Sequence, residues 1–176
     1  QKRRPIADFF RRLVRKKPLG VVGGVIVFLM LLSGIFANVI APYSMTEAHP
    51  VDSLSPPSRA YLLGTDSLGR DLFSRVIYGA RISMIVGLAG AGLCTALAAV
   101  IGIISGFAGG KLDTIVQRFV DTFMCFPALF VILTVMSILG QGLAQVIIVL
   151  GVNQGIRQSR VVRSAVIGIK ENEIGR

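Results

Sequence analysis

The clearest candidate for binding chemistry is a segment with two glycines, Gly64-Thr-Asp-Ser-Leu-Gly-Arg-Asp71. It resembles the phosphate loop G-x-x-x-x-G-K-[ST], in which backbone amides and a lysine hold phosphate groups. Here Arg70 replaces the lysine, and Asp71 places a negative charge where a hydroxyl would meet Mg²⁺. No apolar strand precedes the segment. The sequence therefore does not predict nucleotide binding at this position.

Two carboxylates, Asp113 and Asp121, are the candidates for proton or ion transfer, because acidic residues inside membranes often have that role. Both lie close to basic residues, Lys111 and Arg118, at the edge of an apolar stretch. Their position predicts solvated carboxylates at a membrane surface. We therefore expect no proton-coupled pump and no channel built on carboxylate rings.

Metal, redox and hydrolytic centres are not predicted either. His49 is the single histidine of the sequence and cannot assemble a metal site on its own. Cys94 and Cys125 lack C-x-x-C spacing, which favours packing cysteines over a redox pair. No Ser/His/Asp triad can be assembled from the pattern. We expect a protein without a catalytic site and without a directly bound cofactor.

The elements that position these residues are three long runs without any charged residue or histidine. They cover Pro18–Thr46, Ile82–Gly110 and Thr122–Ile156, which is 29, 29 and 35 residues. A helix needs about 20 apolar residues to cross a hydrocarbon core of about 30 Å. Each run is long enough to do so, which predicts an all-α integral membrane protein.

The composition agrees with a membrane protein. Hydrophobic residues make up 53% of the chain, charged residues 16%, and the mean hydropathy is +0.71. A net charge of +10 on a soluble surface would suggest nucleic-acid binding. Here the basic residues gather between the apolar runs, so we expect a lipid membrane as the partner and no nucleic acid.

The third apolar run is too long for one crossing and contains a natural break at residues 140–142, Gly-Gln-Gly. We expect a hairpin with helices near 122–139 and 143–156, and therefore about four spans. With the N-terminus in the cytoplasm, fifteen Lys and Arg residues lie inside and four lie outside. Because short basic loops stay in the cytoplasm, this count favours a multi-pass protein with a cytoplasmic N-terminus.

The resulting organisation has four parts. Residues 1–17 form a basic amphipathic segment in the cytoplasm, and residues 18–41 form the first span. Residues 42–81 form an outer loop with a short amphipathic helix, and residues 82–176 form a core with the remaining spans. The basic segment suits a helix in the membrane interface, although a simple topogenic charge cluster explains it equally well.

The short outer helix is expected to begin with a cap at Asp66 or Ser67. Its apolar residues include Leu72 and Phe73, and Asp71 and Arg75 are spaced four apart for an ion pair along the helix. The helix is expected to lie on the outer surface and to lead into the second span.

A row of small residues follows in the second span, where Ala98, Gly102, Gly106 and Gly110 recur every four positions. Such a row lets another helix approach closely, which is the usual packing mode in membranes. The competing explanation is that glycine is generally common in membrane helices. We predict a packing face.

Several segments together resemble one family. The run from Leu63 to Ser83 closely resembles the segment before the second span in ABC-transporter permeases of the dipeptide/oligopeptide/nickel family, especially their second, dipeptide-permease C-type subunit. Further matches are the turn Gly109–Asp113, the run Arg118–Pro127 and the run Arg160–Glu173. The signature residues of the outer helix are Gly64, Thr65, Asp66, Gly69, Arg70, Asp71, Arg75 and Arg81.

This resemblance implies a type I ABC importer permease of six spans, without chemistry of its own. It would pair with a sister permease to form the path for peptides or similar small solutes. An extracytoplasmic binding protein would deliver the solute to the cell membrane of a bacterium or archaeon, and two cytoplasmic ATPases would use ATP and Mg²⁺. The lead-in to the ATPase-coupling loop would comprise Arg160, Arg163, Lys170, Glu171, Glu173 and Gly175.

The chain departs from the family pattern after Glu173, where a member would continue with Glu-Ala-Ala-x-x-x-Gly and two further spans. The sequence therefore predicts a C-terminal part that is missing. A non-transporting membrane scaffold or assembly subunit is the alternative function, motivated by the row of small residues. An integral membrane enzyme is a weaker one. From the residues alone, Arg157, Arg160 and Arg163 would be a topogenic basic cluster. The sequence does not identify the solute or the residues that bind it.

Overall fold

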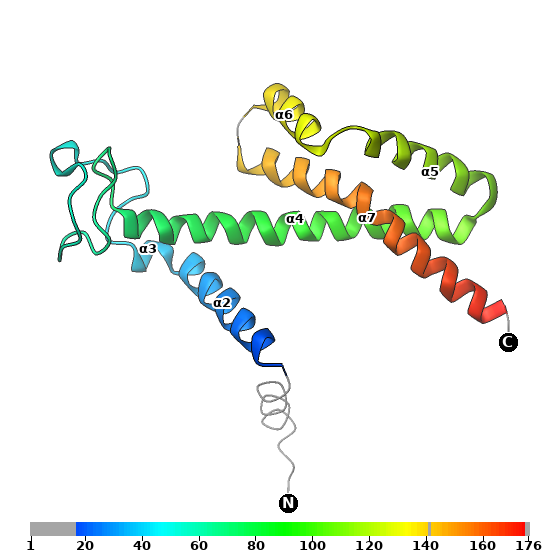
Figure 1. The fold of residues 1–176 in the computed structure, drawn as a ribbon, viewed down its shortest axis with the longest axis horizontal. Coiled ribbons are helices and arrows are strands. Elements are labelled where there is room, and N and C mark those ends of the chain that lie inside the picture. The colour runs from blue at the N-terminus through cyan, green and yellow to red at the C-terminus, as the bar shows by residue number, and fades with distance from the viewer. Residues whose placement is uncertain (1–16, 141, 175–176) are drawn as a thin grey trace, which may run out of the picture. The chain divides into compact units, whose positions relative to one another are not determined.

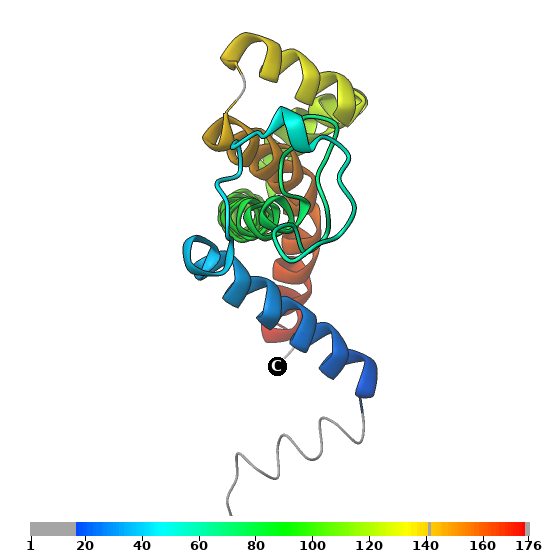
Figure 2. The same cartoon turned by 90° about the vertical axis from the view of Figure 1, so that its left-hand side faces the viewer.

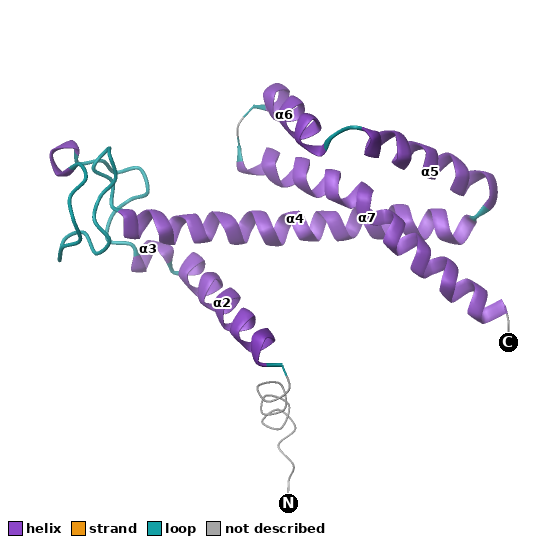
Figure 3. Cartoon of the chain, in the orientation of Figure 1, coloured by secondary structure: helices purple, strands orange, loops and turns teal. Residues whose placement is uncertain are grey.

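The computed structural model describes residues 17–140 and 142–174, almost all of them helical outside one loop (Figures 1 and 3). The helices are α2 (Pro18–Ile35), α3 (Ala37–Ile40), α4 (Leu72–Ala108), α5 (Gly110–Cys125), α6 (Ala128–Leu139) and α7 (Leu143–Ile174). A short 3-10 turn, η1, covers Pro50–Asp52. No strand occurs among the described residues, which confirms the predicted all-α class.

The chain divides into two compact units, residues 1–84 and 85–176. The first unit contains α2, α3 and a loop over residues 41–71 that gathers at the N-terminal end of α4 (Figure 1). Pro18 begins α2, a position where its missing N–H costs no hydrogen bond. Near the end of α2, Gly34 lies against the backbone of Arg81, and a Cβ on it would be 3.1 Å from the Arg81 Cα.

Helix α4 is continuous for 37 residues, so the predicted outer helix and the second span form one helix without a break near residue 82. No proline interrupts Leu72–Ala108, and the apolar residues of the predicted surface helix continue the helical pattern directly. At 1.5 Å per residue the helix is about 55 Å long, which exceeds a hydrocarbon core of about 30 Å. Figure 2 views this helix end-on.

The second unit contains a sharp bend between α5 and α6, which meet at 86°. Pro127 causes the break, because proline has no N–H and disfavours a helical conformation at the residue before it. Phe126 is accordingly extended, with φ −81° and ψ 131°. The predicted single helix near 122–139 is therefore wrong, since residues 122–125 end α5 and α6 begins at Ala128.

The predicted break at residues 140–142 is confirmed, because α6 ends at Leu139 and α7 begins at Leu143. Gly140 has φ +82°, a conformation that suits glycine. Helices α6 and α7 then pack against each other as the expected hairpin. Helix α7 continues to Ile174, well past the predicted end at residue 156.

Two described helices, α2 and α4, are long and apolar enough to cross a membrane by themselves, and the bent pair α5–α6 would make a third candidate. The sequence predicted about four. The difference arises because α6 has only 12 residues, about 18 Å, and because the long α7 becomes polar after its first half. Residues 1–16 of the predicted basic segment lie outside the described residues.

Candidate functional site: a polar loop and an arginine row

The signature loop, residues 64–71, is built around Asp66, whose two carboxylate oxygens hold a tight turn. Oδ1 accepts hydrogen bonds from the backbone N–H of Leu68 at 2.8 Å and of Arg70 at 3.0 Å. Oδ2 accepts one from Nε of Arg70 at 2.9 Å and another from Arg75. These donors, the Arg70 backbone N–H first among them, lower the pKa of Asp66 well below its ordinary value of 3.8.

Asp71, and not Asp66 or Ser67, caps α4. Its Oδ2 accepts hydrogen bonds from the backbone N–H of Ser74 at 2.8 Å and from the Ser74 hydroxyl at 2.6 Å. The predicted pair between Asp71 and Arg75 is also wrong, because Arg75 binds Asp66 instead. Asp71 is only 3% exposed and its Oδ1 has no hydrogen-bond partner among the described residues.

Two glycines of the loop have a conformation and surroundings that exclude a side chain. Gly64 has φ +77°, and a Cβ there would be 2.5 Å from the carbonyl oxygen of Ser55. Gly69 has φ +72°, and a Cβ would collide with the carbonyl group of His49. The signature therefore needs glycine at these positions to close the loop on itself.

The remaining signature residues connect the loop to its surroundings. Thr65 is buried. Its hydroxyl donates a hydrogen bond to the carbonyl oxygen of Asp52 and accepts one from the backbone N–H of Ser55 at 2.9 Å. Arg81 donates to Oδ1 of Asn38 at 3.1 Å, which connects α4 to α3. Sequence reasoning missed Asn38 because nothing in the pattern connects positions 43 residues apart.

Tyr61 was also missed. Its hydroxyl donates to Oδ2 of Asp52 at 2.8 Å, and this hydrogen bond raises the pKa of Tyr61 to about 12. Its ring stacks on Tyr43, with ring centroids 5.4 Å apart. The loop is therefore a hydrogen-bonded structure of its own and not an irregular linker.

The row of small residues on α4 faces α7. A Cβ on Gly102 would be 2.7 Å from the carbonyl oxygen of Ser159 and 2.9 Å from the backbone nitrogen of Arg163. A Cβ on Gly106 would be 3.1 Å from the carbonyl oxygen of Arg163, and Ala98 is only 2% exposed. Gly110 has open space around it and begins α5, so it does not take part.

Helix α7 contributes small residues of its own to this contact. Gly151 lies against the side chain of Leu93, and a Cβ on Gly155 would be 3.1 Å from the carbonyl oxygen of Cys94. The two helices therefore approach closely over several turns. Because this face of α4 is covered by α7 of the same chain, it does not offer a free surface to a partner.

Asp113 is the centre of a polar cluster that joins three helices, and the prediction of a solvated carboxylate there is wrong. Its Oδ1 accepts hydrogen bonds from Nε of Arg163 at 2.6 Å and from the hydroxyl of Ser105. A second guanidinium nitrogen of Arg163 binds Oδ2. Ser105 is fully buried and also accepts a hydrogen bond from Nε2 of Gln117 at 2.9 Å.

Asp121 is paired as well, with Arg160 of α7, although both side chains remain over 40% exposed. Arg157 donates to the carbonyl oxygen of Phe126 at 3.2 Å, directly at the bend, and to Oδ1 of Asn153 at 3.3 Å. The interpretation of these arginines as a simple topogenic cluster missed their partners on α5 and at the bend. No sequence signal marks Ser105 or Gln117.

The rest of the predicted coupling lead-in follows along α7. Lys170 donates to the carbonyl oxygen of Phe107 at 3.1 Å and lies 5.7 Å from the centre of its ring. Glu171 is exposed. Glu173 belongs to α7 but its side chain is not described, and Gly175 lies outside the described residues.

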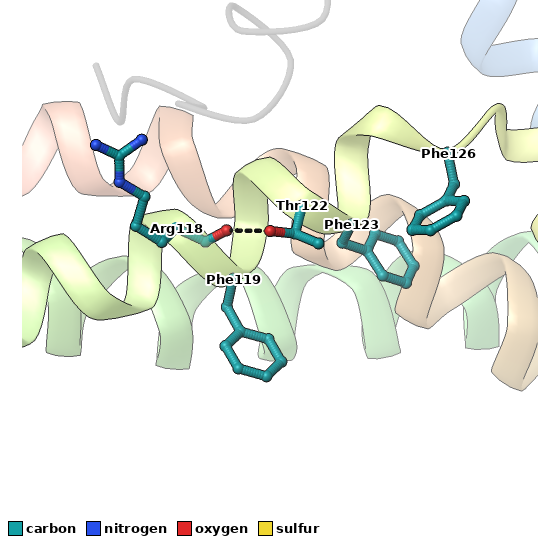
Figure 4. Close-up of a pocket in the computed structure, with 5 residues that line it drawn as sticks. All are labelled: Arg118, Phe119, Thr122, Phe123 and Phe126. Atoms are coloured by element: carbon teal, nitrogen blue, oxygen red, sulfur yellow. Dashed lines mark hydrogen bonds between the residues drawn. The ribbon is translucent and has the colours of Figure 1, made fainter.

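A groove of about 270 Å³ runs along α5 and is lined by Arg118, Phe119, Thr122, Phe123 and Phe126 (Figure 4). The Thr122 hydroxyl donates to the carbonyl oxygen of Arg118 at 2.8 Å, within the helix. No group of three or more metal-ligating side chains occurs in the described part of the chain.

Comparison with known families gives two matches in chain order. Residues 4–57 match the N-terminal TM domain of oligopeptide transport permease C. Residues 98–174 match the family described as binding-protein-dependent transport system inner membrane component. Together the two matches cover well over half of the chain. The chain belongs to the family of inner membrane components of binding-protein-dependent transport systems.

Individual relatives are permease proteins of several transport systems. The oligopeptide transport system permease protein OppC of Bacillus subtilis is 36% identical over 159 residues, which is 90% of this chain and 52% of the relative. The dipeptide transport system permease protein DppC of the same organism is 33% identical over 166 residues, 94% of this chain and 52% of the relative.

The glutathione transport system permease protein GsiD of Pectobacterium atrosepticum is 31% identical over 170 residues, 96% of this permease chain and 56% of the relative. The chain therefore spans about half the length of the curated relatives that it matches.

Proposed function

We propose that this chain is a membrane-spanning permease subunit of an ATP-driven ABC importer. With a sister permease it would form the translocation path for peptides or similar small solutes, which an extracytoplasmic binding protein delivers. The observation that carries the proposal is the match of residues 98–174 to the inner membrane component of binding-protein-dependent transport systems. That match includes the close α4–α7 contact and the arginine-bearing half of α7.

The chain itself would supply no catalytic group. ATP and Mg²⁺ would be used by two cytoplasmic ATPase subunits, and α7 would carry the chain toward them with Lys170, Glu171 and Glu173 near its end. The N-terminus would lie in the cytoplasm of a bacterial or archaeal cell, since this orientation keeps most of the basic residues inside.

Reconstitution tests the proposal directly. The chain is incorporated into sealed vesicles with a sister permease and both ATPases, and a binding protein loaded with radiolabelled dipeptide is added outside. We expect peptide uptake that requires ATP and binding protein, together with stimulated ATP hydrolysis. Vesicles that lack this chain are the matched control.

The alternative function, a membrane scaffold without transport, predicts a different result. The chain would insert and bind a membrane partner, but uptake would not depend on ATP. The row of small residues no longer favours a scaffold, because α7 of the same chain covers Gly102 and Gly106. Stable partner binding without ATP-dependent uptake would nevertheless contradict the transport proposal.

A further inference from the structure

Three arginines of α7 recur every third residue, and each binds a group of α5 or of the bend that follows it. Arg157 binds the Phe126 carbonyl, Arg160 binds Asp121 and Arg163 binds Asp113. We call Arg157, Arg160 and Arg163 the arginine row. Its partners run backward along α5 as the arginines run forward along α7, so the row joins two antiparallel segments over the length of α5.

The end of the row at Arg163 has the properties of a fixed connection. Its side chain is 30% exposed and that of Asp113 only 15%, so the pair is shielded from much of the solvent. Two guanidinium nitrogens bind the two carboxylate oxygens, a planar geometry that lysine cannot reproduce. Ser105 adds a hydrogen bond from α4, so Asp113 is held from both neighbouring helices.

The end of the row at Arg157 contacts the bend itself. The Phe126 carbonyl has left the helix, because Phe126 is extended before Pro127. A carbonyl without a helical partner is costly in an apolar environment unless a side chain donates to it. Arg157 donates that hydrogen bond, and its position is set in turn by the buried Asn153 one turn earlier.

We propose that the arginine row makes α5 and the α5–α6 bend move together with α7, so that Arg157 and Arg163 are positioning residues for coupling. This inference rests on the proposed function, in which the end of α7 leads to an ATPase. A displacement of α7 would then reach the bend through Arg157 at one end of the row and the beginning of α5 through Arg163 at the other.

The same arginines would also serve as topogenic charges, and that explanation makes a different prediction. Topogenic charge depends on the number of basic residues and not on their partners. Arg163→Lys would then be neutral, and Arg163→Gln would have the same effect as Arg118→Gln. Arg118 is the matched control, since its side chain has no ion-pair partner among the described residues.

The first experiment measures the connection in the chain alone, in lipid nanodiscs, and does not require transport. Spin labels replace Thr114 on α5 and Ser164 on α7, both exposed, after Cys94 and Cys125 have been changed to serine. We expect a narrow distance distribution that Arg163→Gln broadens and that Arg118→Gln leaves unchanged. Asp113→Arg combined with Arg163→Asp should restore the narrow distribution.

The second experiment measures coupling in the reconstituted transporter as solute imported per ATP hydrolysed. We expect Arg163→Gln to lower this ratio about fivefold or more while ATP hydrolysis continues, with Arg163→Lys also impaired and the charge exchange restoring the ratio. A merely structural role would lower transport and hydrolysis together and leave their ratio unchanged.

The two experiments separate the possible failures. An unchanged distance distribution in Arg163→Gln, or no recovery on charge exchange, overturns the connection. An unchanged ratio with a broadened distribution overturns its role in coupling. If the unmodified complex does not import solute at all, the proposed function fails and the inferred coupling fails with it, while the distance measurement still shows whether the row joins α5 to α7.

Discussion

Ser74 and Ser105 are both fully buried and both donate a hydroxyl hydrogen to an aspartate, yet they hold different kinds of structure. Ser74 binds Asp71 three residues away and accepts from the Tyr43 backbone N–H at 3.1 Å, which closes the loop onto the start of α4. Ser105 binds Asp113, whose other partner, Arg163, is 50 residues further along the chain.

The difference is one of sequence distance. The loop network is formed mostly between residues fewer than 20 positions apart, so it can form before the helices pack. The helical cluster forms only when α4, α5 and α7 have come together. The loop is thus a local structure that positions backbone groups, whereas the helical cluster exists only in the assembled helices.

The largest effect is expected at Gly69 in the loop. An alanine there must adopt φ +72° and its Cβ must displace the carbonyl group of His49, so we expect Gly69→Ala to destabilise the loop by about 3 kcal/mol. Faster amide exchange at His49, whose N–H bonds to the Gly69 carbonyl, would report the opening. Gly110→Ala is the control, because Gly110 has φ +56° with open space around it and tests the backbone strain alone.

The corresponding change in the helical region is Gly102→Ala. Alanine favours a helix over glycine by about 1 kcal/mol, but here its Cβ would be 2.6 Å from the Cβ of Val162, and such overpacking costs about 1–3 kcal/mol. We expect a net loss of stability in detergent unfolding. The matched change Gly92→Ala, where nothing lies within 4 Å, should be neutral or stabilising. Equal effects at the two positions would contradict the close α4–α7 contact.

Changing the two serines sharpens the comparison with a smaller effect. Ser74→Ala and Ser105→Ala each remove hydrogen bonds to an aspartate, and we expect a loss of about 1 kcal/mol from each. The exchange of the Tyr43 amide should accelerate only in Ser74→Ala, since that variant removes its acceptor. Because the serines belong to separate networks, the double variant should be additive within about 0.5 kcal/mol. A larger coupling would show that the networks are not independent.

Mild acidification is expected to have the smallest effect on the stability of the loop. Because the pKa of Asp66 is lowered by folding, the stability that its ionised form contributes is complete above the ordinary pKa of 3.8. That contribution is lost progressively below pH 3.8 and is gone once the pH has fallen through the lowered value. The amide chemical shifts of Leu68 and Arg70 should therefore stay constant between pH 7 and pH 5. Asp66→Asn should remove the response that appears in stronger acid.

The membrane class, the α6–α7 break and the close-packed face of α4 could be predicted from the sequence, since each depends on a local property of the chain. Long uncharged runs, the Gly140 break and a four-residue spacing of small residues are visible without knowing any partner. The packing partner of Gly102 was not predictable, because Ser159 is 57 positions away and nothing in its surroundings distinguishes it.

The errors have a common physical origin. Arg75 was assigned to Asp71 because four residues separate them on a helix, but Asp71 caps that helix and Asp66 reaches Arg75 from the preceding turn. Asp113 was expected in solvent because it lies near basic residues at the edge of an apolar stretch, whereas its partner Arg163 comes from a distant part of the sequence. Side chains pair with the groups that are nearest in space, and the spacing of residues in the sequence predicts those neighbours only within one helix.

The bend between α5 and α6 provides a natural chemical reporter of membrane sidedness. Cys125 is exposed and ends α5 directly before the bend, while Cys94 on α4 is partly covered. In Cys94→Ser vesicles with a known protein orientation, a membrane-impermeant maleimide applied from one side would label Cys125 only if the bend meets water on that side. A single thiol already present in the chain can therefore assign the bend to one face of the membrane or to its interior.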